Sequence, residues 1–366
     1  MSDDSGIGKY VRRHLAGLVG YSASTSPETL KGKVEVPVED IIKLDANENP
    51  YGCSPIVCQA LATCSDFNIY PDAGQEVLRK QLAKYTSAAD ESIVASCGSN
   101  LLLDYVIRLF VEPGEEVIDC IPTFDLYRFS TAICSGSMVT VERDENYAVD
   151  VNKLKAAISN KTKLIFLANP NSPTGNITPQ GDIIEILDTG LPVVIDEAYY
   201  EFSGETVVPL VSLYSNLMVL RTFSKWAGLA GLRVGYGIFP PIIADYLHTT
   251  TIPYNVSMAA LIAVRESLAD IDYLMDRVRT IIAERERFFA ELMKLSWLKP
   301  YPSKANFIFC RILRGDAKEL KQKLLNRGIL VRYFDKPLLR NAIRFSVGKT
   351  EHTDRLIKAL RDLGGK

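Results

Sequence analysis

Histidines are few and cysteines are scattered in this sequence of 366 residues. It contains only three histidines, and no two cysteines form a C-x-x-C pair. The cysteines are Cys53, Cys58, Cys64, Cys97, Cys120, Cys134 and Cys310. Because a zinc site needs closely spaced thiol and imidazole ligands, we expect no metal centre. An odd number of cysteines, several inside apolar runs, indicates reduced core residues rather than a disulfide framework.

Long apolar runs and a surplus of either charge are also absent. No stretch reaches the about 18 apolar residues of a membrane span, and the acidic start "MSDDSGIGKY" does not resemble a signal peptide. The formal net charge is -2, whereas proteins that bind nucleic acid usually carry a basic surplus. We therefore expect a cytoplasmic protein with small-molecule partners, and neither a nucleic acid nor a membrane among them.

Apolar, β-branched segments recur between residues 92 and 239 and alternate with segments of helical spacing. Seven strands are expected, within 92–98, 115–121, 137–143, 163–170, 191–198, 217–224 and 233–239. Strands that are apolar on both faces and alternate with helices are typical of a mostly parallel sheet covered on both sides. The sequence therefore predicts one large α/β domain with a seven-stranded sheet.

The rest of the chain indicates a smaller α+β domain and an N-terminal arm. A charge-rich helical stretch is expected at 256–295, followed by short strands and helices. The arm is too polar to fold alone, with a short amphipathic helix expected at 10–18 and a loop at 22–37. We expect it to pack on the rest of the chain or on a second subunit. The predicted division is an arm with the start of the small domain (1–46), a large domain (47–250) and a small C-terminal domain (251–366).

Two charged residues follow buried strands. Asp196 ends the run "LPVVID", and Lys225 follows "LMVLRTFS" before a stretch of glycines and small residues. Both are expected at the carboxyl edge of the sheet, where open α/β sheets bind ligands. A buried lysine offers a neutral amine that can attack an aldehyde, and a buried acid can hold a protonated ring nitrogen. An exposed lysine and a helix-capping acid are the simpler interpretations.

Polar groups near these residues suit a phosphate. Thr222 and Ser224 offer hydroxyls and Arg233 a guanidinium, which together can hold a dianion. Residues 98–100, Gly-Ser-Asn, lie between an expected strand and an expected helix, so their amides could bind an anion. Serine and asparagine are also ordinary helix caps. The sequence contains no G-x-G-x-x-G motif after a strand, no Walker lysine and no G-x-S-x-G elbow.

In their order along the chain, the motifs resemble those of the fold-type-I, pyridoxal-phosphate-dependent aminotransferases, and among them the histidinol-phosphate aminotransferases. The motifs are "KLDANENPYG" (43–52), "YPD" (70–72), "GSN" (98–100), "PTFDLY" (122–127), "NPNSPTG" (169–175), "DEAY" (196–199), "RTFSK" (221–225), "AGLRVGY" (230–236) and "RFSVG" (344–348). "ANENPYG" together with "YPD" is the most specific pair for the subfamily. The resemblance implies a large domain that binds pyridoxal 5'-phosphate (PLP) and a smaller α+β domain.

The resemblance also implies roles at the cofactor. Lys225 would hold PLP as a Schiff base and move the proton between the substrate carbon and the cofactor. Asp196 would bind the pyridine nitrogen, Tyr199 would donate to the 3-oxygen, and Phe124 would stack on the ring. The phosphate would be held by Ser99, Asn100, Thr222, Ser224 and Arg233.

Further residues are implied at the substrate and at a subunit interface. Arg344 would bind the carboxylate or phosphate of the substrate as a bidentate fork. Arg332 is a second candidate for a substrate phosphate, and Asn47 is a further substrate contact. Tyr70 would reach the cofactor phosphate of the neighbouring subunit, which implies a homodimer.

The chain departs from the family pattern at two positions. The family often has asparagine directly before "PTG", where it contacts the 3-oxygen of the cofactor. Here Ser172 occupies that position and Asn171 precedes it, so either residue could take the role. The family often has an acid after its Gly-Ser or Gly-Ala pair, where this chain has Asn100. Neither departure removes the lysine, the ring acid or the phosphate arginine.

The activity implied by the resemblance is transfer of an amino group between L-histidinol phosphate and 2-oxoglutarate, as in histidine biosynthesis. Arginines suit both substrates, since one carries a phosphate and the other two carboxylates. A PLP-dependent decarboxylase of a phosphorylated amino acid and an aminotransferase for aromatic or other amino acids are alternatives with the same fold. A protein that lost catalysis is disfavoured, because Lys225 and Asp196 are both present.

Overall fold

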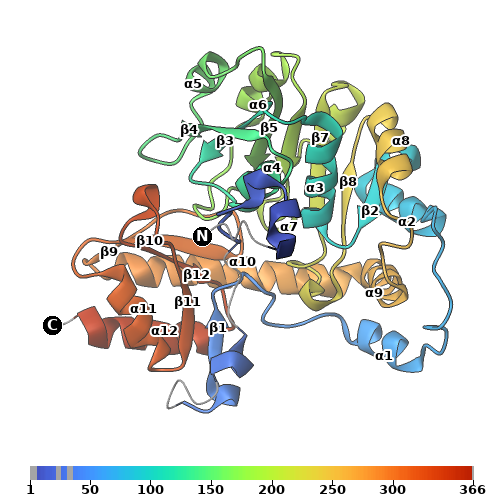
Figure 1. The fold of residues 1–366 in the computed structure, drawn as a ribbon. Helices are drawn as coiled ribbons and strands as arrows, with labels where there is room; N and C mark the ends of the chain where they lie inside the picture. The colour runs from blue at the N-terminus through green and yellow to red at the C-terminus, as the bar shows by residue number, and fades with distance from the viewer. Residues whose placement is uncertain (1–5, 22–25, 31–35, 365–366) are drawn as a thin grey trace.

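The computed structural model describes residues 6–21, 26–30 and 36–364 and consists of two packed bodies (Figure 1). The larger body contains a seven-stranded sheet, and the smaller one contains a five-stranded sheet. No helix in these ranges is long and apolar enough to cross a membrane.

The large sheet has the strand order β2-β8-β7-β6-β5-β3-β4. Its strands are β2 (Ile93–Ser96), β3 (Glu116–Ile121), β4 (Ser137–Glu142), β5 (Thr162–Ala168), β6 (Val193–Asp196), β7 (Leu217–Thr222) and β8 (Gly235–Ile238). Strand β8 pairs antiparallel with β2 and β7, and the other neighbours pair in parallel. The prediction of a mostly parallel, seven-stranded sheet is confirmed.

Alternate residues of these strands face two separate cores. In β6, for example, Val193 and Ile195 belong to one core and Val194 to the other. The face of Val194 is covered by α3 (Ser99–Phe110), α4 (Leu126–Ile133) and α8 (Pro241–Thr250). The opposite face is covered by α1 (Pro55–Thr63), α2 (Glu76–Thr86), α5 (Val151–Ala156), α6 (Gln180–Leu187), α7 (Tyr200–Ser203) and α9 (Met258–Ala269). Burial on both faces explains why the strands read as continuous apolar runs.

The small sheet has the order β1-β11-β12-β10-β9. Its strands are β1 (Ile42–Leu44), β9 (Leu298–Pro300), β10 (Phe307–Ile312), β11 (Ile329–Tyr333) and β12 (Ala342–Ser346). Helices α11 (Ala317–Leu325) and α12 (Thr350–Gly364) pack on it. The N-terminal strand β1 pairs in parallel with β11, so the start of the chain completes the C-terminal body.

Helix α10 (Ile271–Met293) joins the two bodies. Its first half contributes Leu274 and Val278 to the core of the large body. Its second half contributes Phe288 and Leu292 to the core of the small body. One continuous helix therefore packs in the cores of both bodies and connects the two sheets.

The helical stretch predicted at 256–295 is confirmed as α9 and α10. The two helices are separated at Asp270, which leaves helical geometry (φ -110°, ψ 37°) and whose carboxylate accepts a hydrogen bond from the hydroxyl of Ser54. One prediction of local structure is wrong. The segment 10–18 contains a 3-10 helix at Arg13–Leu15 instead of an amphipathic α-helix, and Gly17 has a positive φ of 81° that no helix continues through.

The arm lies on the large body. His14 Nε2 is 3.1 Å from the carbonyl oxygen of Ile133, which ends α4. The predicted loop 22–37 lies partly outside the described residues, and Pro27–Leu30 within it forms a 3-10 helix. The other 3-10 helices are Gly6–Tyr10, Val38–Asp40, Asp90–Ser92, Val208–Ser212, Ala230–Leu232 and Pro337–Leu339.

Candidate active site

Two adjoining cavities lie where the carboxyl ends of β5, β6 and β7 meet the small body. The inner cavity has a volume of about 260 Å³ and the outer cavity about 460 Å³. Both are lined by Tyr21, Ala46, Asn100, Phe124, Ser172, Tyr199, Lys225 and Arg233. This edge is where open α/β sheets present side chains to ligands. Most residues predicted from the motifs therefore meet in one place.

Lys225 follows β7 and lines both cavities. Its Nζ donates a hydrogen bond to the carbonyl oxygen of Ala46 at 3.0 Å. Burial, with a further contribution from the positive charge of Arg344, lowers the pKa of Lys225 to about 8. About a tenth of the amine is therefore neutral at pH 7 and able to act as a nucleophile.

Asp196 is the last residue of β6 and lines the inner cavity. Its Oδ2 accepts a hydrogen bond from the hydroxyl of Tyr127 at 2.9 Å, and its Oδ1 accepts one from the amide of Ala198 at 3.1 Å. Burial raises the pKa of Asp196 to about 6. Among the described residues it forms no ion pair, so the carboxylate has room for a cationic partner from the cavity.

Hydroxyls and one guanidinium also line the inner cavity. Arg233 Nη1 donates to Ser224 Oγ at 3.4 Å, and Thr222 Oγ1 donates to the same oxygen at 2.9 Å. Helix α3 begins here at Ser99, after Gly98. Gly98 has a positive φ of 87°, which favours glycine at this position. A helix N-terminus, hydroxyls and an arginine together form an anion site.

Aromatic residues line the space between the lysine and the acid. Phe124 borders both cavities and packs edge-on against Tyr127, with ring centroids 5.6 Å apart. The hydroxyl of Tyr199 accepts a hydrogen bond from Asn47 Nδ2 at 2.9 Å. Burial raises the pKa of Tyr199, so it stays a neutral hydrogen-bond donor. Asn47 is held in turn by Ser346, whose hydroxyl donates to Asn47 Oδ1 at 2.9 Å.

The two candidates before "PTG" lie on different sides of the backbone. Ser172 lines both cavities, and its Oγ accepts a hydrogen bond from Arg344 Nη1 at 3.1 Å. Asn171 is fully buried. Its side chain bonds to Thr123 (2.8 Å), to the carbonyl oxygen of Pro122 (3.0 Å) and to Thr174 (2.7 Å). Its amide is thus already used to hold the turn together.

Two arginines lie opposite each other at the outer cavity. Arg332 of β11 and Arg344 of β12 are register partners across the two strands, and both line this cavity. Arg344 is 9% exposed, and its Nη2 donates to the carbonyl oxygen of Asp45 at 2.7 Å. Its Nε is buried without a hydrogen-bond partner, and burial lowers its pKa. A buried guanidinium that forms no ion pair with any described residue is a site for an anion.

Two predicted site residues line neither cavity: Asn171, which is buried in its turn, and Tyr70. Tyr70 lies apart from the site on the surface. It is 77% exposed, and its ring packs on Tyr254 with centroids 4.7 Å apart. Two lining or supporting residues were not predicted from the sequence. Tyr127 stood inside the motif "PTFDLY" and holds Asp196. Tyr21 comes from the arm, which has no pattern, and packs edge-on against Phe124.

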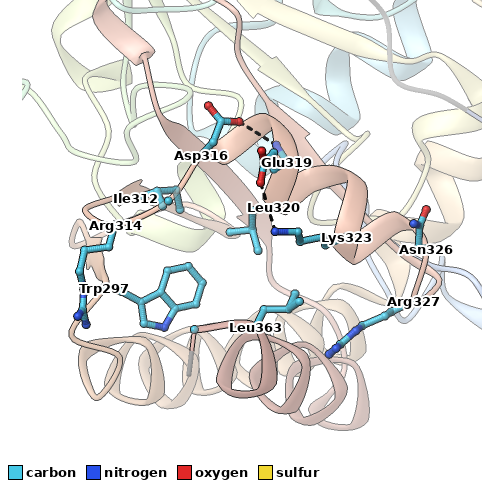
Figure 2. A pocket seen from close by; sticks show the side chains of 12 residues that line it. Trp297, Ile312, Arg314, Asp316, Glu319, Leu320, Lys323, Asn326, Arg327 and Leu363 are labelled. Carbon is cyan, nitrogen blue, oxygen red and sulfur yellow. Dashed lines mark hydrogen bonds and ion pairs between the residues drawn. The ribbon is translucent and has the colours of Figure 1, made fainter. Parts of the chain in front are cut away.

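A further cavity of about 550 Å³ lies in the small body between α11, α12 and Trp297 (Figure 2). Two of its cations are already paired, because Lys323 lies 3.2 Å from Glu319 and Arg327 lies 3.3 Å from Asp362. Asp316 caps α11, and Arg314 donates to Ser296 Oγ at 3.0 Å. No group of three His, Cys, Asp or Glu residues in the described ranges could hold a metal ion.

The chain belongs to the aminotransferase class I and II family, whose model matches residues 39–360. It is 53% identical over 356 residues to the histidinol-phosphate aminotransferase of Dehalococcoides mccartyi, a match that covers 97% of this chain and 98% of that protein. It is 42% identical to the chloroplastic histidinol-phosphate aminotransferase 1 of Arabidopsis thaliana, over 96% of this chain and 85% of that protein. The solved histidinol-phosphate aminotransferase of Sinorhizobium meliloti, in complex with pyridoxal-5'-phosphate, has a TM-score of 0.86 at 27% identity, over 96% and 97% of the two chains. The expected fold and family are confirmed.

The residues of the inner cavity fit PLP. Asp196 is a buried acid that lacks a described cationic partner, as a protonated pyridine nitrogen requires. Lys225 offers an amine of lowered pKa to an aldehyde. The anion site at Arg233, Ser224 and the start of α3 suits the phosphate.

Proposed function

We propose that this aminotransferase uses PLP to transfer an amino group between L-histidinol phosphate and 2-oxoglutarate. Support for the reaction comes from the two histidinol-phosphate aminotransferases that match nearly the whole chain. The observation that carries the proposal is the convergence of Lys225 and Asp196 on one cavity with two arginines at its outer end. An amino donor with a phosphate and an acceptor with two carboxylates both need such cations.

The proposed cofactor contacts are those that the family resemblance implies, and the grouping of these side chains around the inner cavity supports them. Lys225 would hold the aldehyde of PLP, and Asp196 would bind its pyridine nitrogen. Phe124 would stack on the ring, and Tyr199 would donate to the 3-oxygen. The phosphate would be bound by Ser99, Asn100, Thr222, Ser224 and Arg233. Of the two residues before "PTG", we assign the contact with the 3-oxygen to Ser172, since the polar atoms of Asn171 already have partners.

When bound, PLP supplies an electron sink for the charge left after a proton leaves the substrate carbon. Lys225 Nζ takes that proton and returns it, which a pKa of about 8 allows near neutral pH. Asp196 keeps its negative charge at the ring nitrogen and so keeps that nitrogen protonated. Arg344 orients the anionic group of the substrate as a bidentate fork, while Arg332 and Asn47 complete the substrate site.

Assembly and location are further proposals. Tyr70 is exposed in its own chain, near the exposed apolar side chains Phe67, Ile69 and Tyr254, and this supports a homodimer in which Tyr70 reaches the cofactor phosphate of the other subunit. Seven free cysteines support a reducing, cytoplasmic location. The division into 1–46, 47–250 and 251–366 stays a proposal about folding units.

The test is an absorbance titration of the protein loaded with PLP. The visible band of the bound cofactor is expected to bleach with L-histidinol phosphate and to return with 2-oxoglutarate. Glutamate should bleach it as well, because it is the product of the second half-reaction. A band that ignores histidinol phosphate would reject the substrate, and carbon dioxide release from L-threonine phosphate without a keto acid would indicate the decarboxylase. No band after addition of PLP would reject the cofactor.

A further inference from the structure

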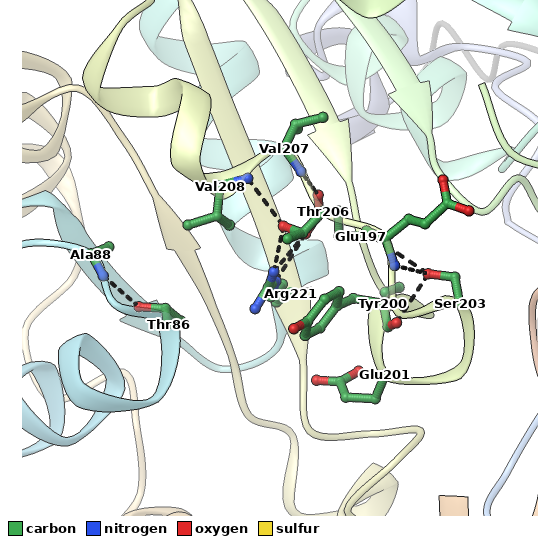
Figure 3. Close-up of polar contacts among 12 residues, drawn as sticks. Thr86, Ala88, Glu197, Tyr200, Glu201, Ser203, Thr206, Val207, Val208 and Arg221 are labelled. Carbon is green, nitrogen blue, oxygen red and sulfur yellow. Dashed lines mark hydrogen bonds and ion pairs between the residues drawn. The ribbon is translucent and has the colours of Figure 1, made fainter. Parts of the chain in front are cut away.

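A buried ion pair between Glu197 and Arg221 lies at the end of β6, next to Asp196 in the sequence (Figure 3). Glu197 directly follows Asp196 and is fully buried. Its carboxylate lies 2.8 Å from Arg221 Nη2 and accepts a hydrogen bond from Arg221 Nε at 3.0 Å. It also accepts from Thr206 Oγ1 at 2.8 Å and from the amide of Val207 at 2.7 Å. The two neighbouring acids therefore have different partners: Asp196 lines the inner cavity, and Glu197 forms an ion pair with Arg221.

Arg221 connects this acid to the strand that leads to Lys225. It is the second-last residue of β7, four positions before the lysine. Its Nη2 donates to Thr206 Oγ1 at 2.7 Å, and its guanidinium lies over the ring of Tyr200 at 3.6 Å. The pair therefore joins the turn after β6 to the end of β7, on the two strands that carry the ring acid and the lysine.

Stability alone does not explain such a pair. Replacing a buried ion pair by apolar residues of similar volume is often neutral or stabilising. What four donors on one carboxylate do provide is a single permitted geometry, because any shift of Glu197 would leave buried polar atoms without partners. A shift of β6 relative to β7 is therefore strongly disfavoured at the ends of the two strands that carry Asp196 and Lys225.

The same cluster contains a matched control. Glu201 is also buried, and its pKa is raised to about 7, chiefly by burial. Its hydrogen bond comes from the hydroxyl of Tyr85 on α2, at 3.0 Å. In the described contacts it makes no hydrogen bond to β7, and it interacts with Arg221 through charge alone, so it shares the environment of Glu197 without hydrogen-bonding the two strands together.

We propose that the Glu197–Arg221 pair is a positioning device that fixes Asp196 relative to Lys225 across the cofactor cavity. The inference rests on the proposed use of PLP, although not on the identity of the amino donor. Catalytic groups must be held within about 0.5 Å of the productive geometry, and neither Asp196 nor Lys225 is anchored by an ion pair of its own among the described residues. The Glu197–Arg221 pair supplies that anchor.

The test compares Glu197→Gln, Arg221→Lys and the control Glu201→Gln. Two readouts report geometry at the cofactor: the Kd of PLP for the apoprotein, and the pH midpoint of the visible band in the loaded protein. For Glu197→Gln and Arg221→Lys, we expect a Kd at least about tenfold higher and a shifted midpoint, since a displacement of about 1 Å can cost about 100-fold in rate. Glu201→Gln should leave both readouts unchanged, and it should not lower the thermal midpoint of the apoprotein at pH 8, because burial already disfavours the charged form of Glu201.

Thr206→Val removes one hydroxyl from the carboxylate and leaves the ion pair in place, so it keeps the test informative if the stronger variants do not fold. A smaller shift of Kd and midpoint in the same direction is expected. If the Kd of PLP and the pH midpoint do not change in folded variants, or change equally in Glu201→Gln, the positioning role of the Glu197–Arg221 pair is overturned. The cofactor assignment still holds in that case if the wild-type protein has its visible band. A wild-type protein without a band would overturn both.

Discussion

At the scale of single residues, the burial of Lys225 has a measurable consequence without any cofactor. Its pKa of about 8 lies below the ordinary 10.5, so the unfolded chain binds the proton more tightly. Charged Lys225 therefore destabilises the apoprotein at pH 7, and this effect disappears as the pH rises from about 8 to 10.5.

Lys225→Met should abolish the visible band and turnover, and it should raise the free energy of unfolding of the apoprotein at pH 7 by about 1–3 kcal/mol. Denaturant titrations at pH 7 and pH 10 measure the gain, which should shrink at the higher pH. Lys318→Met, at an exposed position of α11, is the control and should change stability by less than about 0.5 kcal/mol. Retained turnover would contradict the assigned mechanism.

The burial of Asp196 shifts a pKa in the opposite direction from that of Lys225. Its pKa of about 6 lies above the ordinary 3.8, so the folded chain binds the proton more tightly than the unfolded chain. The stability from this protonation is fully present below about pH 3.8 and is lost as the pH rises through about 6.

Asp196→Asn keeps a group that can accept from Tyr127 but removes the charge. We expect apoprotein at pH 8 to gain about 1–3 kcal/mol, with little difference at pH 4, and PLP binding to weaken. Turnover should fall by about 1000-fold or more, as the ring nitrogen loses its ionic partner. Unfolding curves at the two pH values and single-turnover rates check this, and near-normal rates would mean that the ring lies elsewhere.

Residues at strand ends were predictable from sequence, and residues on turns were less so. Asp196 and Lys225 follow apolar runs, and this pattern indicates the carboxyl edge of a sheet. The choice between Asn171 and Ser172 depends on which way a tight turn directs each side chain, and spacing does not encode that. Tyr21 lies in an arm without periodicity, so its place beside Phe124 follows only from tertiary packing.

At the scale of elements, the loop 46–53 lies directly against the turn that carries Lys225. A Cβ at Gly228 would lie 2.2 Å from the carbonyl oxygen of Gly52, and Gly228 has a φ of 69°. Backbone atoms on both sides leave no flexible group that could move aside. Glycine is therefore required at position 228, because the backbone of the loop 46–53 approaches the lysine turn closely there.

Gly228→Ala should destabilise the protein by at least about 2 kcal/mol and weaken PLP binding, because the loop must move away from the lysine turn. Gly231→Ala is the control, since a Cβ there meets no atom within 4 Å. Thermal unfolding and the Kd of PLP measure both effects. Equal behaviour of the two variants would show that the approach of the loop is not needed.

Elements with strong periodicity were predicted well, and their ends were not. All seven strands of the large sheet came from apolar runs, because burial on both faces leaves a clear pattern. The break at Asp270 was missed, since residues 256–295 carry helical spacing on both sides of it. What ends α9 there includes a hydrogen bond from Ser54, a residue 216 positions away along the chain.

At the scale of the whole molecule, the proposed homodimer predicts complementation between subunits. Tyr70→Phe removes the hydroxyl that we expect to serve the other subunit, and Lys225→Ala inactivates its own site. A heterodimer of the two variants has one site with an intact lysine and an intact tyrosine from the partner.

Mixing the two inactive or impaired proteins, after partial unfolding and refolding together, should restore activity to about a quarter of the wild-type level, from one intact site in half of the dimers. Each variant refolded alone is the control. Activity that never exceeds the sum of the separate variants would show that Tyr70 does not act across the interface.

The pairing of β1 with β11 also determines when the protein can become active during its synthesis. Residues 42–44 emerge from the ribosome long before their partners 329–331. Asn47 lies three residues after β1 and is held in part by Ser346 of β12. A nascent chain that stops before β12 thus lacks Arg344 and the Ser346 contact of Asn47, so the substrate site exists only after β12 has been synthesised.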